Sequence, residues 1–304
     1  MQRKTLQNSF SISGKGIHSG KNCSVTILPH KSRKGIIFER TDLKANHQVC
    51  ASLDFVQTDS QRQTILQSQD VRIQTPEHLL ASLFAFGITD AKIQIDSEEV
   101  PILDGSAKTF WREINIVGTE ILHERIEPLE ITQRYEIRES GSSIKVSPSD
   151  SFSAKISSNF REIGFLEETY TLEDFPQISQ ARTFCYLSEV ELLLKAGLIQ
   201  GGSLDSAFVI VDSAPTDFLK SQFPKFNFEQ DFSRIKIISS EGNNFRIPKE
   251  PLAHKFLDLV GDFSLLQIPI LAKVEAVSPS HRLNHKILKE IFSNEFQRIQ
   301  KLRA

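Results

Sequence analysis

The sequence predicts an α+β fold built from two similar halves, and two observations carry this prediction. Short segments in which apolar and polar residues alternate, as in half-buried strands, are interspersed with apolar helices along all 304 residues. Each half also contains an apolar helix with a histidine near its start, followed by an Ile- or Val-rich strand: PEHLLASLFAF before AKIQI, and LAHKFLDLVGDF before ILAKVEAV. Two such layers packed together would place both histidine-bearing helices at their interface. The repetition suggests a duplication.

The first half, which we expect to extend over residues 1–122, alternates strands with one clear helix. CSVTILP and AKIQI have the period of two that half-buried strands show, and GIIFERTDL predicts a further strand. TPEHLLASLFAFGI predicts a helix with Thr75 as its N-cap, Pro76 at the first helical position and Gly87 as its stop. A turn is expected at Asp104, in VPILDGSAKTF.

The second half, which we expect to extend over residues 126–304, begins with the strand-like segments IEPLEITQRYEI and SSIKVSPSDSFSAKIS. A helix is predicted for YLSEVELLLKAGL and a buried strand for the end of GGSLDSAFVIV. Residues 213–250 are expected to be an irregular surface excursion. The helix LAHKFLDLVGDF, an apolar strand in LLQIPILAKVEAV and a final helix follow, the last with Phe296 and Ile299 on its inward face.

Composition narrows the possible partners and location. The 36 Lys and Arg residues nearly balance 38 Asp and Glu residues, and no basic block stands out, so we expect no nucleic-acid partner. Three widely spaced cysteines suit a reducing cytoplasm and exclude a Cys-based zinc finger. The N-terminal segment has no apolar export signal, and no apolar run reaches the length of a membrane span. The 22 phenylalanines are expected mainly in the core, with an apolar ligand passage as an alternative use.

The segment LAHKFLDLVGDF places His254, Asp258 and Asp262 four residues apart, on one face of an otherwise apolar helix. One interpretation is a simple His–Asp ion pair. The other is a metal site, because a histidine and an aspartate one turn apart can converge on one ion. His78 is the best third ligand, since the adjacent Glu77 can serve as the base that a metal-activated water requires. Glu77 also suits a charge–dipole contact at a helix N-terminus.

His281, in SPSHRLNH, is a further candidate. Asp262 could hold its imidazole protonated, which would make it a general acid, whereas the simpler interpretation is that it begins the last helix. His18 lies between glycines in GKGIHSG, which indicates a tight turn that approaches another group closely. The neighbours of other histidines are typical of solvated loops, namely those of His30, His47 and His123.

Several motifs together carry a resemblance to a known family. SGKGIHSG, TPEHLLAS, VPILDGSA, ARTF, GLIQGGSLD, HKFLDLVGD and SHRLNH occur in the order and at roughly the spacing of the motifs of the zinc-dependent UDP-3-O-acyl-N-acetylglucosamine deacetylases of lipid A biosynthesis. The resemblance covers nearly the whole chain. It implies two similar α+β domains, each a β-sheet layered with helices, packed as a sandwich with the active site between them. It also implies one Zn²⁺ per chain, with Fe²⁺ possible in the same site.

The resemblance assigns roles to the polar residues identified above. The implied zinc ligands are His78, His254 and Asp258, with a water in the open position. Glu77 would be the general base that deprotonates this water. His281 would be the acid that protonates the departing amine, supported by Asp262.

Further residues follow from the same family pattern. Thr183, in ARTF, would hydrogen-bond the tetrahedral oxyanion, and Phe184 would pack near the substrate. Lys255 would meet a polar or phosphate-bearing part of the substrate, and we add His18 to the substrate-binding residues. The segment near 180–200 would form an apolar passage for the acyl chain.

The implied reaction is hydrolysis of the acetamide of UDP-3-O-(3-hydroxyacyl)-N-acetylglucosamine, or of its 3-N-acyl counterpart, with release of acetate. This is the committed step of lipid A biosynthesis, and we expect a monomeric enzyme. Two alternatives use the same residues. A non-haem iron oxygenase also binds its metal with two histidines and one carboxylate, and a non-catalytic protein could hold a structural metal beside a bound lipid.

Overall fold

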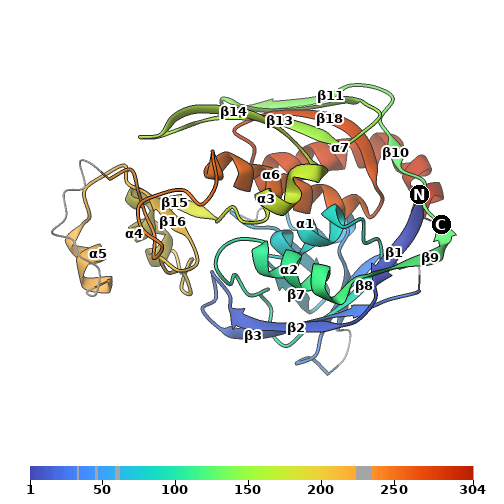
Figure 1. Ribbon diagram of the computed structural model, residues 1–304, viewed down its shortest axis with the longest axis horizontal. Helices are drawn as coiled ribbons and strands as arrows, with labels where there is room; N and C mark the ends of the chain where they lie inside the picture. Colours follow the sequence, from blue (N-terminus) through green and yellow to red (C-terminus); the bar gives the residue numbers. More distant parts are fainter. Residues whose placement is uncertain (33, 45–46, 59–61, 224–234, 304) are drawn as a thin grey trace.

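Two β-sheets form the outer layers of the molecule, and the main helices lie between them (Figure 1). The computed structural model describes residues 1–32, 34–44, 47–58, 62–223 and 235–303. A smaller unit projects from one end of the sandwich, on the left in Figure 1. This arrangement confirms the predicted α+β class.

The first sheet has the strand order β2-β3-β8-β4-β5. Its neighbours run antiparallel except β8 and β4, which are parallel. In β3 the alternate residues Cys23, Val25 and Ile27 are buried, as the period-two pattern predicts. The strands span Phe10–Lys15 (β2), Asn22–Pro29 (β3), Ile36–Arg40 (β4), Gln48–Cys50 (β5) and Ala91–Ile95 (β8).

The second sheet repeats this plan strand by strand, with the order β11-β12-β18-β13-β14. Again only its third and fourth strands, β18 and β13, are parallel along that path. A short strand, β10, adds to β18 in parallel. The strands span Leu129–Glu130 (β10), Tyr135–Glu139 (β11), Ser142–Pro148 (β12), Ser153–Phe160 (β13), Gly164–Thr171 (β14) and Ile270–Val277 (β18). The identical order and directions support the duplication that the sequence only suggests.

The helices follow the same repetition, because α1 leads into β8 and α2 follows it, just as α6 leads into β18 and α7 follows it. They span Glu77–Ala85 (α1), Lys108–Val117 (α2), Phe175–Ile178 (α3), Glu250–Phe263 (α6) and His281–Arg303 (α7). Two strand pairs complete this body, β1 (Gln2–Leu6) with β9 (Thr119–Arg125), and β6 (Ile65–Ser68) with β7 (Val71–Gln74). Short 3₁₀ turns lie at Leu53–Phe55, Leu172–Asp174 and Ser264–Leu266.

The two halves meet where α6 crosses α1, and Gly261 makes the close crossing possible. A Cβ atom at Gly261 would lie 2.3 Å from the carbonyl oxygen of Glu77, far inside van der Waals contact. Only a residue without a side chain therefore allows α6 to pass so near the start of α1. The predicted meeting of the two histidine-bearing helices is confirmed.

The projecting unit has a small sheet of its own, in the order β15-β16-β17. It has its own apolar cluster, which includes Val190, Val209 and Leu219. Its elements span Phe184–Tyr186 (β15), Leu187–Lys195 (α4), Phe208–Ile210 (β16), Asp217–Gln222 (α5) and Ile237–Ile238 (β17).

Three details of the sequence prediction are wrong. Residues 213–250 are not wholly irregular, because they contain α5 and β17, although part of this range lies outside the described residues. Thr75 does not cap α1, because its backbone is left-handed and its hydroxyl donates to Gln63 and Glu99 instead. Phe296 is 46% exposed, since the inward face of α7 passes through Glu295 and Ile299. The boundary between residues 122 and 126 stays a prediction.

Across the described residues, no helix combines the length and the apolar character needed to span a bilayer. Within the same part of the chain the three cysteines form no disulfide.

Candidate active site

The two halves bring His78, His254 and Asp258 together where α1 meets α6. His78 is the second residue of α1, and the other two lie one turn apart on α6. Asp258 Oδ1 lies 3.4 Å from His254 Nε2 and 3.7 Å from His78 Nε2. The two imidazole rings meet edge to face, with their centres 5.0 Å apart. His254 Nδ1 donates to the carbonyl of Ala181 at 3.1 Å, which leaves Nε2 free to act as a ligand.

These three side chains fit a metal ion. Their ligand atoms all lie within 4.8 Å of one another. Tetrahedral ligands about 2 Å from an ion are roughly 3.3 Å apart, close to the observed separations and longer than a good hydrogen bond. Burial lowers the pKa of His254 to about 4, which keeps it in the neutral form that binds metals. Although burial opposes ionisation of Asp258, His254 and His281 hold its pKa below the usual range.

Glu77, the first residue of α1, lies beside this trio and is 3% exposed. Its Oε1 is 3.6 Å from His281 Nε2, and its Oε2 accepts a hydrogen bond of 3.3 Å from the backbone N–H of Thr64. Burial raises the pKa of Glu77 to about 7, against the opposing effect of His281 and His78. A carboxylate with such a pKa can take up and release a proton near neutral pH.

His281 begins α7, as the simpler interpretation predicts, and it also lies beside Glu77 and Asp262. Its Nδ1 is 2.8 Å from Asp262 Oδ2, and its Nε2 is 4.0 Å from Asp258 Oδ2. Burial disfavours the imidazolium, but Asp262, Asp258 and Glu77 outweigh it and raise the pKa of His281 to about 10. His281 therefore holds a proton on Nε2 that faces Glu77.

A second buried cluster surrounds Asp262, which is fully buried on α6. Its carboxylate accepts from His281, from Asn284 Nδ2 at 2.9 Å, from Thr64 Oγ1 at 2.6 Å and from His285 Nε2 at 3.1 Å. Although Asp262 and the two histidines could also group around an ion, these are hydrogen-bond distances, and the carboxylate is satisfied without one. Burial opposes ionisation, but both imidazoles keep the pKa of Asp262 below its usual range.

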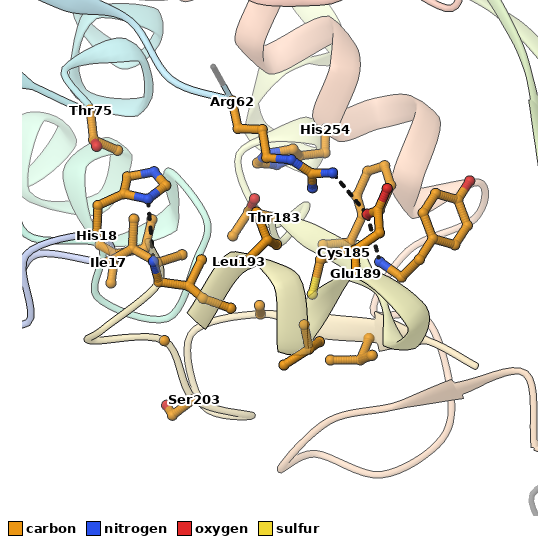
Figure 2. Close-up of a pocket in the computed structure, with 18 of the residues that line it drawn as sticks. Ile17, His18, Arg62, Thr75, Thr183, Cys185, Glu189, Leu193, Ser203 and His254 are labelled. Atoms are coloured by element: carbon orange, nitrogen blue, oxygen red, sulfur yellow. Dashed lines mark hydrogen bonds and ion pairs between the residues drawn. The ribbon is translucent and has the colours of Figure 1, made fainter. Parts of the chain in front are cut away.

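The trio opens into a cavity of about 1080 Å³ that extends between α4 and β16 of the projecting unit. Its lining includes the trio and other polar residues and, from the projecting unit, the apolar residues Val190, Leu193 and Val209. Figure 2 shows Thr183 and His254 near one another, with Leu193 on the α4 side. Arg62 and Glu189 form an ion pair of 2.9 Å beside the same cavity.

The four remaining predicted residues all line this cavity. The backbone of Thr183 is held by a hydrogen bond to the carbonyl of Gly105 at 2.7 Å. Phe184 stacks on Phe208, with ring centres 5.3 Å apart. Lys255 Nζ donates to the carbonyl of Pro279 at 2.8 Å, and burial lowers the pKa of its ammonium.

His18 is buried in a loop that packs closely, as its flanking glycines predict. Its backbone N–H donates to Glu99 Oε1 at 2.8 Å, and its Nδ1 faces the N–H of Ile199 at 3.5 Å. A Cβ atom at Gly16 would lie 2.1 Å from Glu99, and one at Gly20 would lie 3.2 Å from the backbone of Gln200. The loop thus joins the first half to the projecting unit.

Sequence reasoning missed the residues that support this site. Thr64, Arg62 and Glu99 come from loops or strand ends with no local signal. His285 did have a local signal in the sequence, because it follows His281 by a single helical turn. Another missed feature is the buried ion pair Arg182–Glu250, with Nε 2.8 Å from Oε1.

Comparisons with known proteins point to one family. The sequence profile of the UDP-3-O-acyl N-acetylglycosamine deacetylase family matches residues 3–240 and 233–293. The chain is 34% identical to the bifunctional enzyme LpxC/FabZ of Bacteroides thetaiotaomicron, over 96% of its own length but 64% of that relative. It is 34% identical to the UDP-3-O-acyl-N-acetylglucosamine deacetylase of Leptospira biflexa, over 96% and 90% of the two chains. For the deacetylase of the same name from Helicobacter pylori the identity is 31%, over 97% and 92%.

Proposed function

Because the chain belongs to the UDP-3-O-acyl N-acetylglycosamine deacetylase family, we propose that it hydrolyses the acetamide of UDP-3-O-(3-hydroxyacyl)-N-acetylglucosamine, or of its 3-N-acyl counterpart. The products are acetate and the free sugar amine, and the reaction is the committed step of lipid A biosynthesis. One observation carries the proposal. Three side chains that could hold a metal ion, the buried Glu77 carboxylate and the His281 imidazole lie together at a cavity that apolar residues of the projecting unit also line.

His78, His254 and Asp258 are the proposed ligands of one zinc ion, since two imidazoles and a carboxylate with an open fourth position are typical of catalytic zinc sites. Zinc bound there supplies a Lewis acid that polarises the acetyl carbonyl and lowers the pKa of a water. The same ligand set would also accept Fe²⁺. No observation in the described residues favours the oxygenase or the lipid-binding alternative.

Glu77 is the proposed general base. It takes a proton from the attacking water while the water oxygen bonds to the acetyl carbon. Its raised pKa suits this task, because a base works best when its pKa is near the working pH. Thr64 fixes the carboxylate through its backbone N–H.

His281 is the proposed general acid. As the bond between the acetyl carbon and the sugar nitrogen breaks, Nε2 gives its proton to that nitrogen, which leaves as an amine. Asp262 keeps the ring protonated and fixes its orientation through Nδ1. The Thr183 hydroxyl is the proposed hydrogen-bond donor to the oxyanion, and one such donor typically contributes about 3–4 kcal/mol.

The part of the cavity lined by the projecting unit is the proposed passage for the acyl chain. Its lining by α4 and β16 agrees with the role that the family pattern implies for the segment near 180–200. Phe184 would pack near the sugar end, and Lys255 and His18 would contact polar parts of the substrate. A UDP-sugar substrate, and cysteines that form no disulfide in the described part of the chain, favour a cytoplasmic enzyme. The monomeric state stays a prediction.

The direct test is mass spectrometry of zinc-loaded protein incubated with UDP-3-acyl-N-acetylglucosamine. We expect loss of one acetyl group and release of one acetate per substrate, and much slower turnover of UDP-N-acetylglucosamine, which lacks the acyl chain. No acetate release from any acylated substrate would refute the proposal.

A further inference from the structure

A further buried imidazole, that of His285, has no part in the proposed mechanism. It lies one turn after His281 on α7 and is 3% exposed. Its Nε2 is 3.1 Å from Asp262 Oδ1 and 3.0 Å from Thr64 Oγ1. Because an ionised carboxylate only accepts hydrogen bonds, Nε2 carries the proton in this contact.

Thr64 links this imidazole to both reacting groups. Its hydroxyl donates to Asp262 Oδ1 at 2.6 Å, so the oxygen retains lone pairs that can accept from His285. Its backbone N–H donates to Glu77 Oε2. Contacts therefore form a closed ring that runs from Glu77 through Thr64, Asp262 and His281 back to Glu77. His285 contacts this ring at Thr64 and Asp262.

The carboxylate of Asp262 is saturated only when His285 is present. A carboxylate has about four acceptor positions. His281 and Asn284 occupy Oδ2, while Thr64 and His285 occupy Oδ1. Hydrogen bonds at all four acceptor positions fix the orientation of the buried carboxylate, and the loss of one donor would allow the carboxylate to rotate.

The other ring nitrogen argues against a merely space-filling role. His285 Nδ1 is buried and has no hydrogen-bond partner within the described part of the chain. An unsatisfied buried polar atom costs free energy that an apolar side chain of similar size would avoid. The imidazole therefore has a use that its Nε2 proton supplies.

We propose that His285 is a positioning residue: its Nε2–H fixes the Thr64–Asp262 pair and thereby holds Glu77 and His281 in their working orientation. The inference rests on the proposed deacetylase function. The described residues that line the cavity do not include His285, Thr64 or Asp262, so the effect of losing His285 should fall on turnover rather than on binding.

Three variants test this role. His285→Leu removes the donor but fills the space, and His285→Gln keeps an N–H donor. Ile291→Val, a mild core change on the same helix, is the matched control for stability. We expect His285→Leu to lower kcat about 10- to 100-fold, as loss of supporting partners does in metalloenzymes. KM and zinc affinity should stay unchanged, and His285→Gln should recover most of kcat, whereas Ile291→Val should leave it unchanged.

A spectroscopic readout accompanies the kinetics. The His281 Nδ1 proton, bonded to Asp262, should give a low-field proton NMR signal that shifts or broadens in His285→Leu and returns in His285→Gln. Wild-type kcat in His285→Leu, or equal losses in the Leu and Gln variants, would overturn the inference. A wild-type protein that releases no acetate would instead refute the proposed function, and the two failures are therefore distinguishable.

Discussion

The crossing of α6 over α1 gives the sharpest prediction, through the variant Gly261→Ala. The added Cβ would lie 2.3 Å from the Glu77 carbonyl oxygen, whereas ordinary contacts begin at 3.4 Å. The two helices must therefore separate by about 1 Å. The separation moves Glu77 and His78, which lie on α1, away from His254 and Asp258, which lie on α6.

The expected cost falls on activity more than on stability. A misplacement of about 1 Å in an active site can lower the rate about 100-fold. Overpacking costs about 1–3 kcal/mol, but alanine is about 1 kcal/mol better than glycine inside a helix. We therefore expect kcat to fall about 100-fold while the free energy of unfolding falls by only about 0–2 kcal/mol.

Acetate release and urea unfolding measure the two quantities. The control is Gly141→Ala, in the turn between β11 and β12, where nothing lies within 4 Å but φ is +83°. That strain should cost about 1 kcal/mol of stability and no activity. Wild-type kcat in Gly261→Ala, or a loss of kcat no larger than that in Gly141→Ala, would refute the reasoning.

Three further predictions concern the cavity, the general acid and the buried ion pair. Leu193→Trp should raise KM for long acyl chains far more than for short ones, because Leu193 lines the proposed acyl passage; equal effects at all chain lengths would contradict this. In metal-free protein the folded-state pKa of His281, about 10, exceeds its ordinary value of 6.5. Its contribution to stability should be complete below about pH 6.5 and lost as the pH rises towards about 10; unfolding of His281→Gln should lack this slope. Arg182→Met should cost about 3–5 kcal/mol in urea unfolding, because Glu250 is left buried and unpaired, and Arg182→Met/Glu250→Leu should recover most of that loss.

The sequence contains most of what determines the fold. Alternation in β3 and β8, and the histidine-bearing helices in each half, already predict two α+β layers that meet at those helices. The structure adds the matched strand orders, which depend on pairings between distant segments such as β13 with β18. Local patterns carry no information about such pairings, because the alternation of apolar and polar residues within a strand does not determine which other strand it pairs with.

The sequence likewise predicts some residues of the site and not others. His254 and Asp258 are predictable because a step of four residues places them on one helical face. Thr64 is not, since its partners Asp262 and His285 lie 198 and 221 residues away. The error at Thr75 has a local cause that the sequence does not reveal. Its left-handed backbone turns the hydroxyl away from the helix that a threonine before proline usually caps.

The central claim is that Glu77 does chemistry beside a metal that other residues hold. Metal content and acetate release, measured on the same preparations of wild-type, Glu77→Gln and Asp258→Asn protein, test it most directly. Glu295→Gln serves as the control for changing a buried glutamate elsewhere. We expect Glu77→Gln to keep one zinc per chain and lose turnover, Asp258→Asn to lose both, and Glu295→Gln to keep both. Full turnover in Glu77→Gln, or loss of its zinc, would contradict the account.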